Sequence, residues 1–217
     1  MARMDKSRDA WIVGATGLVG GHALRGLLED PHFSRVLSIV RRPSGVQHAR
    51  LEEKVVDFES LSRELAGRHA DVAICCLGST IKQAGSKERF RHIDFDYVLA
   101  FAQSALSAGA THFIVVTALG ADEKSRIFYN RVKGELEAAL RSFGFSALTI
   151  VRPALLLGER SEKRFGERLA APLSKLLPKG VRGIEASKVG RALVHYARQD
   201  TGGVQVVQSK DLQDFAA

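Results

Sequence analysis

The chain has 217 residues, of which 45% are hydrophobic and 26% are charged. This composition is typical of a globular protein and excludes a disordered chain, and the length favours one domain over two. The chain has 32 Lys and Arg against 24 Asp and Glu, so its net charge is +8. Such a charge favours an anionic partner, but it does not choose among phosphate groups, nucleic acid and membrane surfaces.

Neither a disulfide framework nor a metal site is indicated by the sequence. Cys75 and Cys76 are adjacent in an apolar run, and the seven histidines show no metal-ligand spacing. No apolar stretch reaches the length of about 20 residues that a membrane helix needs, and the first residues include acids and glycines where a signal peptide needs an apolar run. We therefore predict a cytoplasmic protein without a metal and without a membrane span.

Short apolar runs alternate with segments of helical spacing, as in a parallel sheet that is covered by helices on both faces. The predicted strands are residues 10–13, 36–40, 54–56, 72–76, 113–117, 147–151 and 204–207. The predicted helices are residues 18–28, 61–66, 87–108, 127–143, 165–177 and 188–197. This order predicts an α/β fold, a doubly wound parallel sheet of the Rossmann type, with residues 1–217 in a single domain.

The pattern changes after Arg152 and Pro153, where a basic, loop-rich stretch replaces the alternation of strands and helices. In open α/β sheets, ligands bind outside the carboxyl ends of the strands, and a late insertion on that side can build the substrate site. We assign about residues 153–186 to a small substrate-side wall of the same domain.

A glycine-rich turn follows the first predicted strand and leads into the first predicted helix. Gly14 permits a tight turn, Gly17 lets the backbone approach a pyrophosphate, and Gly20 allows the helix to pack closely on the strand. The start of the helix adds free amide donors and a positive dipole. The glycine spacing differs from G-x-G-x-x-G, and a turn that serves packing alone is the alternative, but its position favours a dinucleotide site.

Two arginines, Arg41 and Arg42, directly follow the second predicted strand, at the place where an acidic residue usually holds the ribose of NAD. Cationic side chains there favour the 2′-phosphate of NADP, by about ten- to hundredfold over NAD. Asp57 and Phe58 follow the third strand and are candidates to contact the adenine. Solvated surface arginines and a simple turn at Asp57 are the alternative interpretations.

Tyr129 and Lys133 are four residues apart at the start of a predicted helix, which places the phenol and the ammonium on one helical face. An ammonium about 5 Å from a phenol favours the loss of the phenol proton, by roughly 3 kcal/mol at an effective dielectric constant near 20. The pair therefore suits proton transfer at a substrate. The spacing alone is weak evidence, and its position after the fifth strand is what favours a catalytic role.

Together the segments GATGLVGG, VVDF, CCLGST and YNRVK resemble the atypical short-chain dehydrogenase/reductases. The segments AGSKERFRHIDFDYVL, VKGELEA and VRPALLLGER are especially similar to the Tat-interacting-protein-like oxidoreductases, and the resemblance covers about residues 10–200. It implies a Rossmann fold that binds NADP(H), more readily than NAD(H), and hydride transfer to or from a small carbonyl or alcohol substrate. Related enzymes include nucleotide-sugar epimerases and dehydratases.

The resemblance also implies roles for individual residues. Tyr129 would be the acid/base, Lys133 its ribose-bonded helper, and Thr117 the hydroxyl that polarises a substrate carbonyl. The implied cofactor-binding residues are Gly14, Thr16, Gly17, Leu18, Val19, Arg41, Arg42, Asp57, Phe58, Leu77, Gly78, Ser79, Lys133, Arg152, Pro153, Ala154 and Leu155. The chain departs from the family at Ala118, where many relatives have a second serine.

Four functions remain open at this stage. The first is an NADP(H)-dependent oxidoreductase, and the second is a regulatory protein that senses NADP(H) without turnover, through a protein partner. Chemistry of the epimerase or dehydratase type is a further alternative, which the short C-terminal region makes less favourable. Nucleic-acid binding rests on net charge alone, because the chain has no recognised base-reading motif. Neither the substrate nor the oligomeric state can be read from the sequence, and a homodimer is one possibility.

Overall fold

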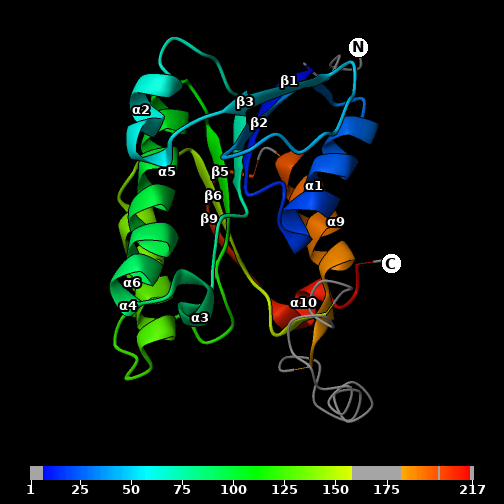
Figure 1. Ribbon diagram of the computed structural model, residues 1–217. Coiled ribbons are helices and arrows are strands. Elements are labelled where there is room, and N and C mark those ends of the chain that lie inside the picture. Colours follow the sequence, from blue (N-terminus) through cyan, green and yellow to red (C-terminus); the bar gives the residue numbers. More distant parts are fainter. Residues whose placement is uncertain (1–6, 158–181, 200, 216–217) are drawn as a thin grey trace.

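The computed structural model describes residues 7–157, 182–199 and 201–215. Its centre is a sheet of seven parallel strands in the order β3-β2-β1-β4-β5-β6-β9 (Figure 1). The strands are β1 (Arg8–Val13), β2 (Phe33–Val40), β3 (Leu51–Val55), β4 (Val72–Cys75), β5 (His112–Val116), β6 (Ala147–Arg152) and β9 (Gly203–Gln208). The predicted doubly wound parallel sheet is confirmed, and each predicted strand overlaps an observed one.

Helices cover both faces of the sheet. Figure 1 shows α1 (Leu18–Glu29) and α9 (Ala186–Ala197) on one face, and α2 (Leu61–Glu64), α4 (Lys87–Arg91), α5 (Tyr97–Ser107) and α6 (Phe128–Arg141) on the other. Shorter elements that the sequence did not predict are a 3₁₀ turn (Phe58–Ser60), α3 (Ile81–Ala84), α10 (Ser209–Leu212) and the paired strands β7 (Leu156–Leu157) and β8 (Ile184–Glu185).

Alternation along β1 shows why both faces need a cover. Ala10 and Ile12 are buried in the core beneath α1 and α9, whereas Trp11 and Val13 are buried in the core beneath α5 and α6. Successive side chains of a strand point to opposite faces, so a strand that is apolar throughout is stable only between two layers. The continuous apolar runs in the sequence therefore correspond to a sheet with two separate hydrophobic cores.

One predicted helix differs from the observed structure. Residues 87–108 form α4, a π-helical turn (His92–Asp96) and α5, rather than one regular helix. Each π-helical turn contains an extra residue, which changes the direction of the side chains on either side of it. The predicted helix 165–177 and most of the proposed wall at 153–186 lie outside the described residues, so the wall stays a prediction.

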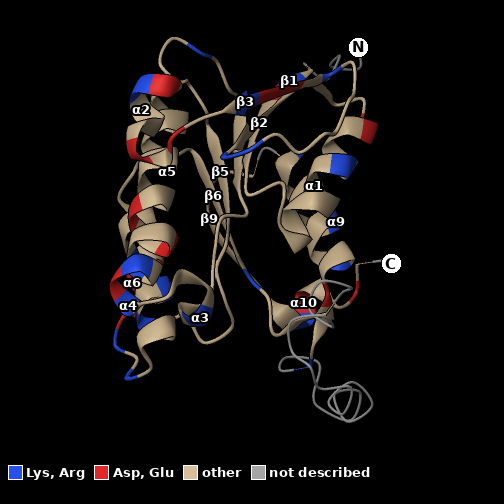
Figure 2. Cartoon of the chain, viewed as in Figure 1, with Lys and Arg blue, Asp and Glu red and all other residues tan. Residues whose placement is uncertain are grey.

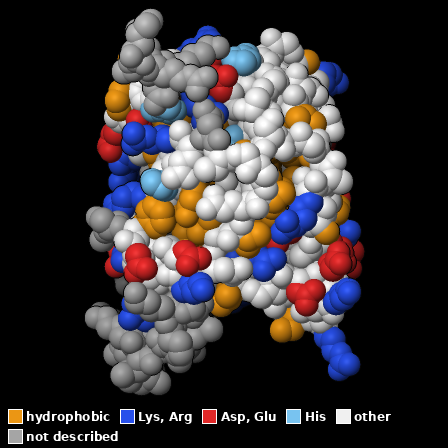
Figure 3. Space-filling view, turned by 180° about the vertical axis from the view of Figure 1, so that it is seen from behind, with side chains coloured by type: hydrophobic (Ala, Val, Ile, Leu, Met, Phe, Trp, Pro, Cys, Tyr) orange, Lys and Arg blue, Asp and Glu red, His pale blue; other side chains and the backbone are white. Residues whose placement is uncertain are grey.

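Most charged residues belong to the helices and the connections, and few belong to the central strands, as the colouring in Figure 2 shows. The opposite view in Figure 3 shows hydrophobic side chains at the surface in the middle of the rear face. In the edge strand β9, Val204 is 48% exposed. In the described part of the chain, no helix combines the length and the apolar character that crossing a bilayer requires.

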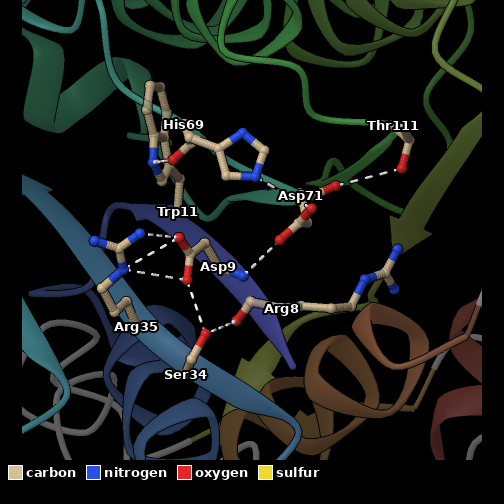
Figure 4. A network of polar contacts seen from close by, with 8 residues as sticks. All are labelled: Arg8, Asp9, Trp11, Ser34, Arg35, His69, Asp71 and Thr111. Carbon is tan, nitrogen blue, oxygen red and sulfur yellow. Dashed lines mark hydrogen bonds and ion pairs between the residues drawn. The ribbon is translucent and has the colours of Figure 1, made fainter. Parts of the chain in front are cut away.

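A polar network joins the amino ends of β1, β2 and β4 (Figure 4). The Asp9 carboxylate accepts hydrogen bonds from Ser34 Oγ (2.8 Å) and Arg35 Nη2 (2.6 Å), and the Asp9 amide donates to Asp71 Oδ2 (2.8 Å). Trp11 Nε1 donates to the His69 carbonyl oxygen (2.9 Å). Because ligands of open α/β sheets bind at the carboxyl ends of the strands, we assign this network a structural role.

On the other face, α1 and α9 approach each other closely at Gly190. A Cβ atom at this position would lie 2.5 Å from His22 Cβ and 3.0 Å from the Ala23 nitrogen. Neither distance is compatible with normal packing, and the Ala23 nitrogen belongs to a helix backbone that cannot move alone. The absence of a side chain at Gly190 therefore sets the distance between the two helices.

We expect Gly190→Ala to lower the free energy of unfolding by about 1–3 kcal/mol, although alanine is the better helix former, because α9 must move away from α1. Denaturant unfolding of both proteins measures this. Arg191→Ala, an exposed change on the same helix, is the control and should stay within about 0.5 kcal/mol. Equal stability of the Gly190→Ala protein and the original would contradict the close contact.

A second prediction concerns acid stability. Burial raises the pKa of Asp9. Hydrogen bonds from Arg35 and Ser34 lower it by a larger amount, so the net pKa lies below its ordinary value of 3.8. Because the pKa of Asp9 is lower in the folded state, its ionised carboxylate stabilises the fold at pH values above the ordinary pKa. This contribution is lost as the pH falls through the folded pKa.

We expect Asp9→Asn to destabilise the protein by about 1 kcal/mol at neutral pH, with a difference that shrinks below about pH 4. Unfolding measured over a pH series checks this, with the exposed Glu123→Gln as the control. A difference that does not depend on pH would contradict the role of the carboxylate charge.

Candidate functional site

The turn after β1 lies directly against the end of β4. Gly14 has a φ of +82°, and a Cβ atom there would lie 2.5 Å from the carbonyl carbon and oxygen of Cys76. Only glycine combines this left-handed conformation with this close contact. As a result, the glycine-rich turn and the segment after β4 lie side by side at the carboxyl edge of the sheet.

Two further glycines shape the start of α1. The Gly17 amide donates to the Gly14 carbonyl oxygen (2.9 Å), and a Cβ atom at Gly20 would lie 2.2 Å from the same oxygen. Gly17 is the N-cap residue of α1, so no side chain caps this helix, and its first turn contains no acid. Thr16 and Gly17 are exposed, Leu18 is half-buried and Val19 is buried. This arrangement fits the pyrophosphate of a dinucleotide, which needs backbone donors without a Cβ in the way.

A cavity of about 580 Å³ lies beyond the ends of β2 and β3. Its lining includes three residues that the sequence predicted for the adenine end of a cofactor, Arg41, Asp57 and Phe58. It also includes Arg89 of α4, which the sequence reasoning missed. Arg42 is exposed and does not line this cavity, so its contact with a phosphate stays a prediction.

The acids of this cavity already have partners within the protein. Asp57 caps the 3₁₀ turn by accepting from the Glu59 amide (3.1 Å), and the Glu59 carboxylate binds Tyr97 Oη (2.5 Å) and His92 Nε2 (2.9 Å). Glu64 Oε2 lies 3.5 Å from Lys54 Nζ. In contrast, the guanidinium groups of Arg41 and Arg89 make no hydrogen bond or ion pair with any described residue. These two cations are available to an anionic ligand.

The contacts of Glu59 also change the ionisation of its neighbours. Burial and the hydrogen bond to Glu59 raise the pKa of Tyr97 to about 12. The hydrogen bonds to Glu59 and Asp96 raise the pKa of His92 above its ordinary value of 6.5. A protonated His92 would therefore strengthen the contacts that hold Glu59 at the mouth of the cavity.

Leu77, Gly78 and Ser79, which the sequence predicts at the cofactor, directly follow Cys76 at the end of β4. Ser79 is bonded to Asp94 of the π-helical turn, because its amide (2.9 Å) and its hydroxyl (2.6 Å) both donate to Asp94 Oδ2. Lys133 Nζ lies 2.7 Å from Asp94 Oδ1. A Cβ atom at Gly78 would lie 3.7 Å from Lys133 Nζ. The structure thus brings Lys133 to this predicted cofactor segment.

Helix α6 carries three of the polar side chains at successive turns of one face. Tyr129, Lys133 and Glu137 are four residues apart, and this spacing aligns them on a helix. The half-buried Tyr129 packs its ring against Phe90, with 5.3 Å between the ring centroids. Lys133 and Glu137 are buried. The helix therefore presents one row of polar groups towards the sheet and the segments that follow its strands.

Glu137 is bonded to two residues from the sheet. Thr117 directly follows β5, and Arg152 is the last residue of β6. The Thr117 hydroxyl donates to Glu137 Oε1 (2.7 Å), and Arg152 Nε donates to the same oxygen (3.0 Å). Glu137 lies two helical turns from Tyr129, or about 12 Å along the helix axis. No hydrogen bond in the described part of the chain joins Thr117 to Tyr129. The predicted role of Thr117 at a substrate carbonyl stays a prediction.

The remaining residues predicted near the nicotinamide follow β6. Pro153 is buried and its carbonyl oxygen accepts from the Leu119 amide (2.8 Å), whereas the Ala154 amide donates to Ser209 Oγ (3.1 Å). Leu155 is 58% exposed. Their backbone is thereby held at the carboxyl edge, where a ligand of this fold would bind.

Sequence reasoning missed Asp94, Glu137 and Arg89. Glu137 could have been found, because it continues the four-residue spacing of Tyr129 and Lys133. Asp94 gave no such signal, since the π-helical turn that directs it inward was not predicted. Among the described residues, no group of three or more His, Cys, Asp or Glu side chains is arranged to hold a metal ion.

Comparisons with known proteins identify the family of the chain. A family model described as NAD(P)H-binding matches residues 14–200 of the chain. The protein HTATIP2 of Rattus norvegicus is 37% identical over 177 residues, which cover 80% of this chain and 73% of that protein. The protein FMP52 of Eremothecium gossypii, which is named as mitochondrial, is 34% identical over 215 residues, covering 94% of this chain and 95% of that protein.

Solved structures share the fold. An oxidoreductase of the short-chain dehydrogenase/reductase family from Burkholderia thailandensis has a TM-score of 0.74 at 19% identity, covering 95% of this chain and 93% of that chain. So low an identity supports the fold alone. The family model and the two relatives decide the assignment: the chain belongs to the NAD(P)H-binding family, with HTATIP2 and FMP52 among its relatives.

Proposed function

We propose that the protein is an NADP(H)-dependent oxidoreductase that acts on a small carbonyl or alcohol substrate. The observation that carries the cofactor choice is the pair of unbonded guanidinium groups, Arg41 and Arg89, at the cavity beside Asp57 and Phe58. A 2′-phosphate adds negative charge and hydrogen-bond acceptors, which guanidinium groups bind strongly. Lys54 beside Glu64 and His92 beside Glu59 offset part of the negative charge of the acids in this cavity.

The rest of a dinucleotide would lie along the carboxyl edge of the sheet. Gly17 and the start of α1 would hold the pyrophosphate, and the segment from Leu77 to Ser79, with Lys133, would hold the nicotinamide ribose. A bound nicotinamide supplies hydride chemistry at its C4 atom. These residues follow β1 and β4 or lie on α6, so they reach one edge from three elements.

Tyr129 is the proposed acid/base. It precedes Lys133 by one helical turn, or about 6 Å along the axis, so its phenol belongs to the same edge as the ribose site. Its hydroxyl would donate a proton to the substrate oxygen during reduction and accept one during oxidation. The Thr117 hydroxyl already donates a hydrogen bond to Glu137, so only its lone pairs are available to accept a hydrogen bond from another group.

A second candidate is a regulatory protein that binds NADP(H) without turnover. Two features favour it: the Thr117 hydroxyl is occupied by Glu137, and Ala118 offers a methyl group where many relatives have a serine. The cytoplasmic location predicted from the sequence stays a prediction. The FMP52 relatives are named as mitochondrial proteins.

We expect the protein to bind NADPH more tightly than NADH, and Arg41→Ala to weaken NADPH binding by about ten- to hundredfold while NADH binding changes little. Titration calorimetry with both nucleotides measures these affinities. Arg42→Ala tests the second arginine predicted from the sequence, and the exposed Arg191→Ala on the opposite face is the control. An NADPH preference that survives loss of both Arg41 and Arg89 would overturn the phosphate site.

Turnover separates the two candidate functions. With a panel of small aldehydes and ketones, we expect Tyr129→Phe to lower kcat by about 10²–10⁴-fold, with NADPH affinity nearly unchanged, because the variant lacks only the proton donor. Consumption of NADPH is followed by absorbance. Full activity of the Tyr129→Phe protein would remove Tyr129 from the mechanism. If the original protein binds NADPH but turns over no member of the panel, the sensor is favoured.

A further inference from the structure

His92 lies between two carboxylates, and one of them, Glu59, lines the cavity that also contains Arg41 and Arg89. The Nε2 atom of His92 is 2.9 Å from Glu59 Oε1, and its Nδ1 atom is 3.0 Å from Asp96 Oδ2. A neutral imidazole has one N–H donor, the imidazolium has two, and an ionised carboxylate only accepts. Both contacts are hydrogen bonds at the same time only when the ring is protonated. The geometry therefore favours a positively charged His92.

Glu59 is the acid of this cavity whose charge His92 offsets. Hydrogen bonds from Tyr97 and His92 lower the pKa of Glu59 below its ordinary value of 4.5, so its carboxylate is ionised at neutral pH. Burial and Glu59 raise the pKa of Tyr97 to about 12, so the phenol stays neutral and adds no positive charge. Without the imidazolium, the negative charge of Glu59 would act directly on a ligand beside Arg89.

Four elements place charged or titratable groups around His92: the 3₁₀ turn, α4, the π-helical turn itself and α5. These groups are Asp57 and Glu59 on the 3₁₀ turn, Arg89 on α4, Asp96 on the π-helical turn and Tyr97 on α5. Helix α6 also packs against the π-helical turn, but its Lys133 and Glu135 are paired there with Asp94 and Arg91. Of these residue types, only histidine has an ordinary pKa near neutrality.

We propose that His92 is a positioning residue that determines the nucleotide specificity of this site. As an imidazolium it fixes Glu59 and offsets its charge beside the 2′-phosphate, and its deprotonation lowers the preference for NADPH over NADH. This inference rests on the proposed function, because it requires that Arg41 and Arg89 bind that phosphate. It adds a residue outside the cavity lining to the groups that select the cofactor.

The direction of the pH dependence follows from the contacts of His92. Hydrogen bonds to Glu59 and Asp96 raise its pKa above the ordinary value of 6.5. The imidazolium is therefore present below that ordinary value and is lost as the pH rises through the raised pKa. A phosphate monoester gains negative charge near pH 6, so its own ionisation strengthens binding to arginine as the pH rises. A preference for NADPH that falls at alkaline pH thus distinguishes His92 from the ligand itself.

The first measurement needs no nucleotide. Proton NMR of the full chain follows the imidazole signals over a pH series, and the signal missing from His92→Gln identifies His92 among the seven histidines. We expect its midpoint above 6.5, and we expect Glu59→Gln to lower it by roughly 0.5–1 pH unit, because one carboxylate partner is lost. A midpoint at or below 6.5 in the original protein would overturn the charged bridge.

The second measurement is calorimetry with NADPH and NADH at pH 6.5 and pH 9. We expect the ratio of the two affinities to fall by roughly three- to tenfold in the original protein, mainly through NADPH, because NADH lacks the phosphate that Glu59 repels. His92→Arg keeps a positive charge at both pH values, and its ratio should not fall. An equal fall in the original and in His92→Arg would overturn the proposal. The control, His195→Arg, adds the same charge on α9, on the opposite face of the sheet, and should behave like the original.

The neutral variant His92→Gln should show the lower ratio already at pH 6.5, roughly three- to tenfold below the original, with little change in NADH affinity. Loss of both affinities together would indicate a merely structural role and would overturn the proposal. The His92 and Glu59 side chains are 37% and 60% exposed, so we expect these variants to fold, and circular dichroism checks it.

The two levels of the argument fail in different ways. Equal affinity for NADPH and NADH at both pH values would overturn the proposed phosphate site, and this inference with it. A strong preference for NADPH that is the same at both pH values, in the original and in His92→Gln, would leave the phosphate site intact and overturn this inference alone.

Discussion

The close approach of the β1–α1 turn to the end of β4 is the contact on which the site depends. Gly14 lies against the Cys76 backbone and Gly20 against the Gly14 carbonyl oxygen, at distances that leave no room for a Cβ atom. Larger residues at either position would push α1 away from the sheet. The open start of α1 and the segment that carries Gly78 and Ser79 would then no longer share one edge.

Helix α6 organises the other half of the site through one row of side chains. Lys133 is tied to the π-helical turn through Asp94, and Glu137 is tied to the ends of β5 and β6 through Thr117 and Arg152. Both acids are buried, and each is bonded to a cation and to a hydroxyl group. Because a buried charge without a partner is costly, these contacts fix the helix relative to the sheet, and with it the position of Tyr129.

The charge that a ligand would meet in the site depends on which charged groups are paired, and not only on how many of each sign are present. The cavity beside Asp57 contains three acids and two arginines. The acids are bonded within the protein, whereas the arginine head groups are bonded to none of the residues that the structure describes. Lys54 and His92 contact two of these acids, Glu64 and Glu59, and offset part of their negative charge. Lys133 is likewise paired, with Asp94, whose Oδ1 atom lies 2.7 Å from its ammonium nitrogen.

The sequence by itself determined the fold class, the glycine-rich turn and the alignment of Tyr129 with Lys133, because these depend on local patterns: apolar runs, glycine spacing and a four-residue helical repeat. Only the tertiary structure decided which charges meet. Asp94 lies 39 positions before Lys133 in the chain. Arg89 lies on α4, which ends at Arg91, where the sequence predicts that a regular helix continues. Contacts between distant segments depend on how helices and strands pack, and a single sequence carries no periodic signal for that packing.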